Sequence, residues 1–130
     1  MAAITFANPP GIPAPAARYS LTAEVAGATR WLLLSGQVPT AADGQVPDAP
    51  EAQAALVGKH LAVALAHHDM RPEHVVKLTT YITTLAMRPA WQPVRDALFV
   101  GVAPPASTLV VVAGLADPRW LIEVELIAAA

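Results

Sequence analysis

The sequence lacks cysteine, carries few charges and has no long apolar run. Without cysteine the chain forms no disulfide, no catalytic thiolate and no cysteine-ligated metal site. Only 14% of the residues are charged and the formal net charge is -2, so the sequence provides no basic surface for nucleic acid. The longest apolar stretches, residues 61–66 and 109–112, are far too short to cross a membrane.

The N-terminal segment has neither the basic region nor the continuous apolar core of a signal peptide. Together with the absence of cysteine, this favours a cytoplasmic protein. Apolar residues, by contrast, are abundant and make up 55% of the 130 residues. A chain of this size and composition is expected to fold as one domain, residues 1–130. Its scarcity of charge indicates that some surface is buried against other copies of the chain.

Prolines and glycines divide the chain into segments whose apolar spacing predicts six strands and two helices. The strands are expected at residues 4–6, 19–26, 30–35, 74–82, 108–112 and 120–128. The helices are expected at residues 51–68 and 89–100, each with a proline at its start. A tight turn at Gly27 and Ala28 is expected to join the second and third strands. This order predicts a two-layer α+β domain, with two helices on one face of a mixed six-stranded sheet.

The last predicted strand has apolar side chains on both of its faces. Because side chains alternate along a strand, they form two rows. One row contains Ile122, Val124 and Leu126, and the other contains Glu123, Glu125 and Ile127. Since the helices cover only one face of the sheet, the second face favours an interface between copies of the chain.

Several short motifs, spread in order over nearly the whole chain, resemble those of one protein family. The segment SGQVP at residues 35–39 is similar to an SGQ-[IV]-P motif, and IEVELIA at residues 122–128 is similar to a closing I-E-[IV]-E-x-[IV]-A. Further matches are NP at 8–9, AARYS at 16–20, QA at 53–54, VKLTTYI at 76–82 and PAS at 105–107. On these motifs the chain resembles the RidA (YjgF/YER057c/UK114) family.

The resemblance implies a chorismate-mutase-like fold and a homotrimer whose sheets pack into a central barrel, with clefts between the subunits. It also implies hydrolysis of reactive imines and enamines without a metal or an organic cofactor. In that family an arginine holds the substrate carboxylate through two hydrogen bonds, and a glutamate on the last strand positions the attacking water.

The family's site residues carry over to this chain with one main exception. Tyr19, Ser35, Gly36 and Glu123 stand at the positions of the family's tyrosine, its SGQ serine and glycine, and its catalytic glutamate. Ser107 stands where the family has its arginine, and the loss of a planar cation is not a conservative change. The chain is therefore interpreted as an arginine-less, divergent member.

Each candidate residue has an ordinary structural interpretation beside the functional one. Glu123 is interpreted as the residue that steers water, or else as a solvated or salt-bridged strand glutamate; Glu125 is expected to be a pairing charge. Ser107 is either a catalytic hydrogen-bond donor or a small polar filler. Arg88 either replaces the missing arginine or lies on the surface, and Tyr19 either binds substrate or is a half-buried aromatic.

The leading hypothesis is a cytoplasmic, trimeric hydrolase or deaminase that acts on a small imine, enamine or related C=N metabolite. Ser35 and backbone N–H groups near Ser107 are expected to stabilise developing charge. Two alternatives stay open: a non-catalytic trimer that binds a metabolite or a partner protein, and a tautomerase or ring-modifying enzyme. Neither RNA cleavage nor metal binding is expected, since the chain is slightly acidic and His60 and His67 lie about 10 Å apart along one helix.

Overall fold

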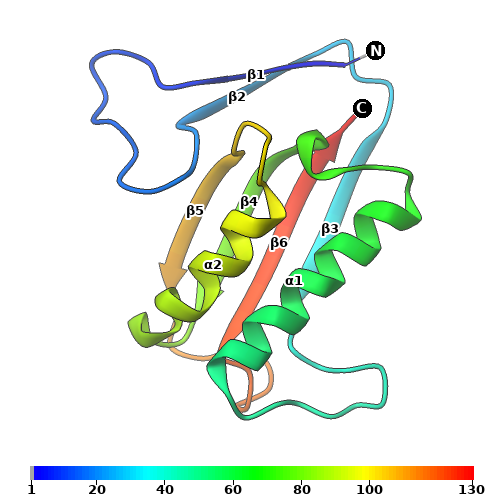
Figure 1. Ribbon diagram of the computed structural model, residues 1–130, viewed down its shortest axis with the longest axis vertical. Helices are drawn as coiled ribbons and strands as arrows, with labels where there is room; N and C mark the ends of the chain where they lie inside the picture. The colour runs from blue at the N-terminus through cyan, green and yellow to red at the C-terminus, as the bar shows by residue number, and fades with distance from the viewer. Residues whose placement is uncertain (1) are drawn as a thin grey trace.

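The computed structural model describes residues 2–130, and its elements follow the predicted order (Figure 1). The strands are β1 (Ala3–Ala7), β2 (Thr22–Ala26), β3 (Trp31–Gln37), β4 (Val75–Ile82), β5 (Ala106–Val111) and β6 (Ile122–Ala129). The helices are α1 (Pro50–His67) and α2 (Arg88–Leu98), and short 3-10 turns at Pro72–His74 and Leu85–Met87 lead into β4 and α2. The predicted α+β class is confirmed.

The six strands form two sheets rather than the one continuous sheet that the sequence pattern predicts. Four strands in the order β3-β6-β4-β5 make the main sheet. It is mixed, because β4 and β5 run parallel while the other neighbours are antiparallel. Strands β1 and β2 pair with each other, and Figure 1 shows this ribbon lying across one end of the main sheet. The main sheet therefore has two edge strands, β3 and β5.

The predicted hairpin between the second and third strands is wrong, because β2 and β3 belong to different sheets. The chain leaves β2 through Gly27, whose φ of 70° suits glycine. Thr29 and Arg30 then both donate their backbone N–H groups to the carbonyl of Ala130, at 2.9 Å, and the Ala130 N–H donates back to the Arg30 carbonyl at 3.0 Å. These bonds to the end of the chain place β3 beside β6 and leave β2 to pair with β1.

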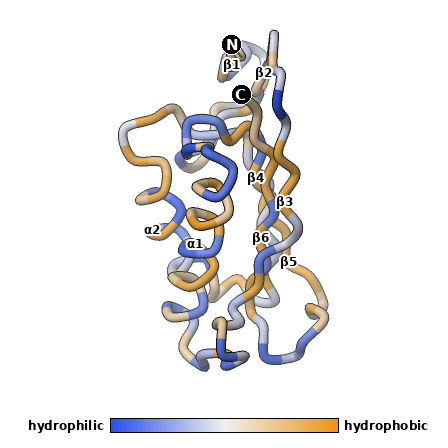
Figure 2. Tube along the Cα trace, turned by 90° about the vertical axis from the view of Figure 1, so that its right-hand side faces the viewer, coloured by the Kyte–Doolittle hydropathy of each residue, from blue (hydrophilic) through white to orange (hydrophobic). Residues whose placement is uncertain are grey.

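Both helices lie on one face of the main sheet, so the molecule has two layers (Figure 2). The apolar side chains of α2 face the core, since Trp91 is buried and Val94 and Leu98 pack against it. Gly58 of α1 allows α2 to approach closely, because a side chain there would overlap Cγ1 of Val94. Neither helix is long and apolar enough to cross a membrane. The largest buried side chains include Leu61, Leu65, Leu78, Trp91, Phe99, Ile122 and Leu126.

The two rows of side chains on β6 separate as predicted. The aliphatic row is buried beneath the helices, whereas Glu123, Glu125 and Ile127 are half-buried on the opposite side of the sheet. No segment of residues 2–130 covers that side, which we call the open face (Figure 2). Trp31 and Leu33 of β3 are 55% and 73% exposed there. The open face is thus partly apolar.

A buried glutamine ties the start of β6 to α1. The side chain of Gln53 is almost fully buried, and its Nε2 donates to the carbonyl oxygens of Pro47 at 2.9 Å and Arg119 at 2.8 Å. Its Oε1 accepts a hydrogen bond from the N–H of Leu121 at 2.9 Å. Two of these bonds satisfy backbone groups just before β6, and the third reaches the loop before α1. They therefore fix the position from which Glu123 projects.

Candidate functional site

The site residues predicted from the sequence lie on two opposite faces of the main sheet. Ser107 pairs in register with Leu78, which is fully buried beneath the helices. Glu123 pairs with Tyr81, which alternates with the buried residues of β4 and so belongs to the open face. Residues directly opposite each other on neighbouring strands project to the same face. One chain by itself therefore does not bring Glu123 and Ser107 together.

The carboxylate of Glu123 lies against the backbone of β3 at Gly36. A Cβ atom added to Gly36 would overlap Oε2 of Glu123 and would lie 2.6 Å from its Cδ. The glycine is required here because the carboxylate occupies the space that any other side chain would fill. The neighbouring Ser35 is exposed. Two predicted residues, Gly36 and Glu123, thus meet on the open face, and Ser35 is the exposed residue next to Gly36 in β3.

The second carboxylate of β6 is held by a tyrosine that the sequence analysis did not single out. The Tyr81 hydroxyl donates to Oε1 of Glu125 at 2.5 Å, which agrees with the expectation that Glu125 is a pairing charge. This hydrogen bond raises the pKa of Tyr81, and burial and the negative charges of Glu125 and Glu123 raise it further. The contact between Tyr81 and Glu125 follows from the pairing of β4 with β6. In this register Tyr81 lies directly opposite Glu123, two residues before Glu125 on the same face.

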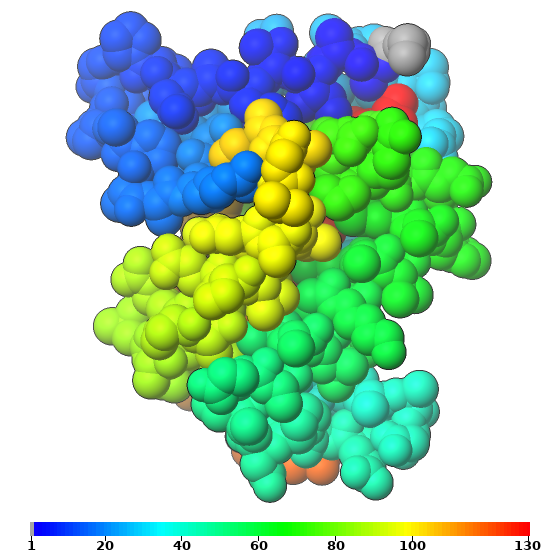
Figure 3. All heavy atoms as spheres, in the orientation of Figure 1, coloured from blue at the N-terminus to red at the C-terminus, as the bar shows by residue number. Residues whose placement is uncertain are grey.

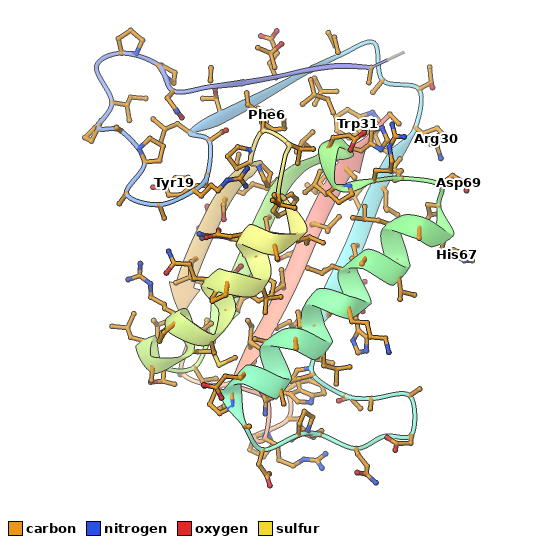
Figure 4. The ribbon with its side chains drawn as sticks, viewed as in Figure 1. Phe6, Tyr19, Arg30, Trp31, His67 and Asp69 are labelled. Carbon is orange, nitrogen blue, oxygen red and sulfur yellow. The ribbon has the colours of Figure 1, made fainter. Side chains whose placement is uncertain are left out.

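The remaining predicted residues meet in a pocket on the helix side, between α2, β5 and the N-terminal segment. The pocket has a volume of about 380 Å³, and Tyr19, Arg88 and Ser107 all line it. Figure 3 shows the N-terminal segment, in blue, beside the yellow-green α2, and Figure 4 shows Tyr19 on this segment close to β5. The other lining residues are Ala16, Ala17, Leu85, Trp91, Gln92, Arg95, Leu109 and Val111.

Hydrogen bonds hold the N-terminal segment over this pocket. The hydroxyl of Ser20 donates to the carbonyl of Pro104 at 2.6 Å, and its N–H donates to the carbonyl of Pro105 at 3.0 Å. Nη2 of Arg18 donates to the carbonyl of Val102 at 2.8 Å. Because these acceptors lie in the loop that leads into β5, Tyr19 is kept beside Ser107.

Two polar side chains of α2 in this pocket were missed from the sequence, Gln92 and Arg95, and Trp91 lines the pocket beside them. Arg95 is 9% exposed, and its Nε and Nη2 both donate to Oδ1 of Asp96, at 3.1 and 3.0 Å. The indole N–H of Trp91 is buried and has no hydrogen-bond partner. Their spacing from Arg88, at three, four and seven residues, would have placed all of them on one helix face.

Comparison with known proteins identifies the family. The family model described as endoribonuclease L-PSP matches residues 11–130. The chain belongs to this family. A search of curated proteins found no match.

Solved structures place the chain with the Rid and YjgF proteins of this family. A Rid-family protein of unknown function from Yersinia pestis, YyfB, is 29% identical over 98% of both chains, with a TM-score of 0.87. A second Rid-family protein from Y. pestis, YyfA, is 25% identical over 98% of this chain and all of that one, with a TM-score of 0.74. The YjgF-family protein NMB1025 from Neisseria meningitidis is 25% identical, covers 98% of this chain and 94% of that one, and gives a TM-score of 0.68. The resemblance drawn from the sequence motifs is thereby confirmed at the level of family and fold.

No group of three or more metal-ligating side chains occurs within residues 2–130. His60 and His67 line a shallow depression of about 390 Å³ on α1, together with Gln37 and His68. The adjacent rings of His67 and His68 stack edge to face, with centroids 4.9 Å apart.

We expect Gly36→Ala to displace the Glu123 side chain while leaving the fold intact. The φ of Gly36 lies outside the left-handed region, so the added methyl group acts by overlap with the carboxylate rather than by backbone strain. The overlap should cost about 1–3 kcal/mol of unfolding free energy, measured in urea, and a crystal structure should show Glu123 in a new rotamer. Gly114→Ala is the matched control, because an added Cβ there meets nothing within 4 Å. An unmoved Glu123 in the Gly36 variant would contradict the expectation.

The pKa of Tyr81 predicts a response of stability to alkaline pH. Since the pKa in the folded protein lies above the ordinary value of 10.0, the bond to Glu125 stabilises the fold fully below pH 10.0, and this stabilisation is lost as the pH rises through the raised pKa. In urea unfolding, the wild type should have a larger free energy of unfolding than Tyr81→Phe at neutral pH. This difference in free energy should become smaller at alkaline pH. Tyr19→Phe is the control, because the Tyr19 hydroxyl makes no hydrogen bond within residues 2–130. A difference in unfolding free energy that stays constant with pH would argue against a stabilising hydrogen bond between Tyr81 and Glu125.

Proposed function

We propose that this Rid-family protein hydrolyses the C=N bond of a small imine, enamine or related metabolite, with Glu123 as the residue that positions and activates water. The observation that carries the proposal is the contact of Glu123 with Gly36. The carboxylate is held against backbone, is only half-buried and takes part in no ion pair within residues 2–130. A fixed, accessible carboxylate is suited to general base catalysis.

The reaction needs only water and one proton carrier. The water oxygen bonds to the imine carbon as Glu123 takes a proton from the water, and the π electrons of the C=N bond move to nitrogen. Glu123 then gives that proton to the nitrogen, which yields a neutral carbinolamine. A second transfer, from the carbinolamine hydroxyl to the amine, forms the C=O bond and breaks the C–N bond. Ammonia and a carbonyl product leave, and the Glu123 carboxylate is restored. Ser35 and backbone N–H groups near Ser107 would stabilise the developing charge.

The pocket and Glu123 would be joined by a homotrimer. Both edge strands of the main sheet expose apolar side chains, Trp31 and Leu33 on β3 and Val110 and Val111 on β5. Exposed edges of this kind favour pairing with another chain. If β5 of each subunit packs beside β3 of the next, three copies close a ring that turns the open faces inward. Ser107 on β5 would then approach Glu123 of the neighbouring subunit.

A non-catalytic trimer that binds a metabolite is the second candidate function. Ser107 favours it, because serine at this position has neither the charge nor the fork of hydrogen-bond donors that an arginine offers a carboxylate. A tautomerase or ring-modifying reaction would use the same half-buried Glu123 as its proton carrier. RNA cleavage, which the family's description names, is not proposed, since the net charge of -2 favours no polyanion.

We expect the wild type to release ammonia and a carbonyl product from freshly generated small imines. Glu123→Gln should lower kcat by about a hundredfold or more, since it keeps the shape of the side chain but removes the base. Imines with and without a carboxylate, compared side by side, would define the substrate class. Glu125→Gln is the matched control, because it alters the neighbouring carboxylate of the same strand. Activity found only in Ser107→Arg would overturn the hydrolase and favour the binding function.

Mixed trimers should reveal whether each site is shared between subunits. Ser107→Trp would fill the pocket of its own subunit but leave Glu123 intact. Glu123→Gln would remove the proposed base of its own subunit but leave the pocket open. Each variant alone should be inactive. Co-expressed at equal amounts, they should recover about a quarter of wild-type activity, since random association leaves one interface in four with both halves intact. Absence of recovery, with light scattering showing a trimer, would contradict a shared site.

A further inference from the structure

The two carboxylates of β6 lean toward opposite neighbouring strands. In the main sheet β6 lies between β3 and β4 (Figure 1), and Glu123 and Glu125 project from the same face of it, about 7 Å apart along the strand. Oε2 of Glu123 lies against Gly36 of β3, whereas Oε1 of Glu125 accepts the hydrogen bond from Tyr81 of β4. Each carboxylate therefore occupies its own side of the strand.

The backbone of β3 leaves Glu125 a second place beside Glu123. The register of β3 with β6 shifts just after Leu34. This β-bulge sets two residues of β3, Ser35 and Gly36, opposite the single residue Glu125 of β6. Gly36 carries no side chain, and the exposed Ser35 has a hydroxyl that can donate to a carboxylate. The β3 side therefore offers Glu125 both space and a hydrogen-bond donor.

No cation of the main sheet neutralises the two carboxylates. The titratable residues of its four strands are Lys77, Tyr81, Glu123 and Glu125, and all of them project to the open face. Nζ of Lys77 donates to Oγ1 of Thr108 on β5, at 2.7 Å. Neither Glu123 nor Glu125 forms an ion pair within residues 2–130. In that part of the chain, the Tyr81 hydroxyl is thus the one side-chain donor that either carboxylate has.

A second negative charge close to Glu123 would oppose its proposed role. Two carboxylates that share one space do not both stay ionised, because their repulsion favours the protonated form of one of them. A protonated carboxyl takes no proton from water, so it is no general base. Base catalysis by Glu123 therefore requires that Glu125 be kept on the β4 side.

We infer that Tyr81 is a positioning residue, whose hydroxyl holds Glu125 on the β4 side and so leaves Glu123 as the working base of the open face. Tyr81 stands directly opposite Glu123, and its side chain reaches diagonally to Oε1 of Glu125. It acts through Glu125 and needs no contact with the substrate. The inference rests on the proposed function, but the placement of Glu125 is measurable without turnover.

The dependence of kcat/KM on pH tests this role in the full-length protein. Tyr81→Phe releases Glu125, so the acid limb of its profile should move to higher pH. At neutral pH its kcat/KM for a small imine should be about tenfold below the wild-type value, and this difference should vanish as the pH rises. Thr79→Val is the matched control, because Thr79 lies opposite Glu125 on the same face of β4 but gives it no hydrogen bond. A profile of Tyr81→Phe identical to that of the wild type would overturn the inference.

A double variant separates this role from a merely structural one. Tyr81→Phe combined with Glu125→Gln still lacks the hydroxyl, but the released side chain is neutral and no longer repels the charge of Glu123. Its kcat/KM at neutral pH should return to within about threefold of the wild-type value, which is the coupling expected of two residues in contact. A loss caused by a damaged fold would not be reversed by the second substitution. A double variant as slow as Tyr81→Phe would therefore overturn the inference.

Crystal structures distinguish failure of this inference from failure of the proposed function. The Glu125 side chain should turn from β4 toward β3 in Tyr81→Phe and should stay in place in Thr79→Val. This displacement, in a protein that hydrolyses no imine, would refute the proposed function and keep the placement of Glu125 by Tyr81. An unmoved Glu125 in Tyr81→Phe would overturn the inference even where the wild type hydrolyses imines.

Discussion

The alternation of side chains along β6 is the constraint on which the rest of this structure depends. The strand lies inside a sheet that carries helices on one side only, so each of its side chains enters either the core or the open face. The aliphatic row holds the two helices in place. The acidic row places Glu123 against Gly36 and Glu125 against Tyr81. A shift of one residue in the register of β6 would bury both carboxylates in the core and expose the aliphatic row.

The same sheet separates Glu123, the proposed catalytic residue, from the pocket lined by Ser107. Ser107 faces α2, while Glu123 faces away from it, so one chain by itself does not bring the two side chains together, and the proposed site includes a second copy of the chain. The two exposed edge strands, β3 and β5, offer the surfaces through which copies can join. Within each pocket, the arginines of α2 stand across from the serine of β5. Position 107 and helix α2 therefore have to be considered together when the substrate of this Rid-family protein is sought.

The sequence predicted those features that depend on local pattern. Short motifs such as SGQVP and IEVELIA led to the correct family, and Gly36 and Glu123, quoted from these motifs, do lie together. Apolar spacing located both helices. The predicted hairpin was wrong because pairing of β3 with β6 is set by bonds between Arg30 and Ala130, residues far apart in the chain.

By itself the sequence determined the α+β class, the order of the elements, the family and the two rows of β6, because each follows from the period of a helix or a strand or from a contiguous motif. Only the tertiary structure decided which side chains meet. Tyr81 reaches Glu125 through the register of two strands, and Arg95 shares a pocket with Ser107 because α2 lies on the face of the main sheet to which Ser107 projects. Contacts of this kind join residues from separate elements, and local periodicity carries no information about which elements become neighbours.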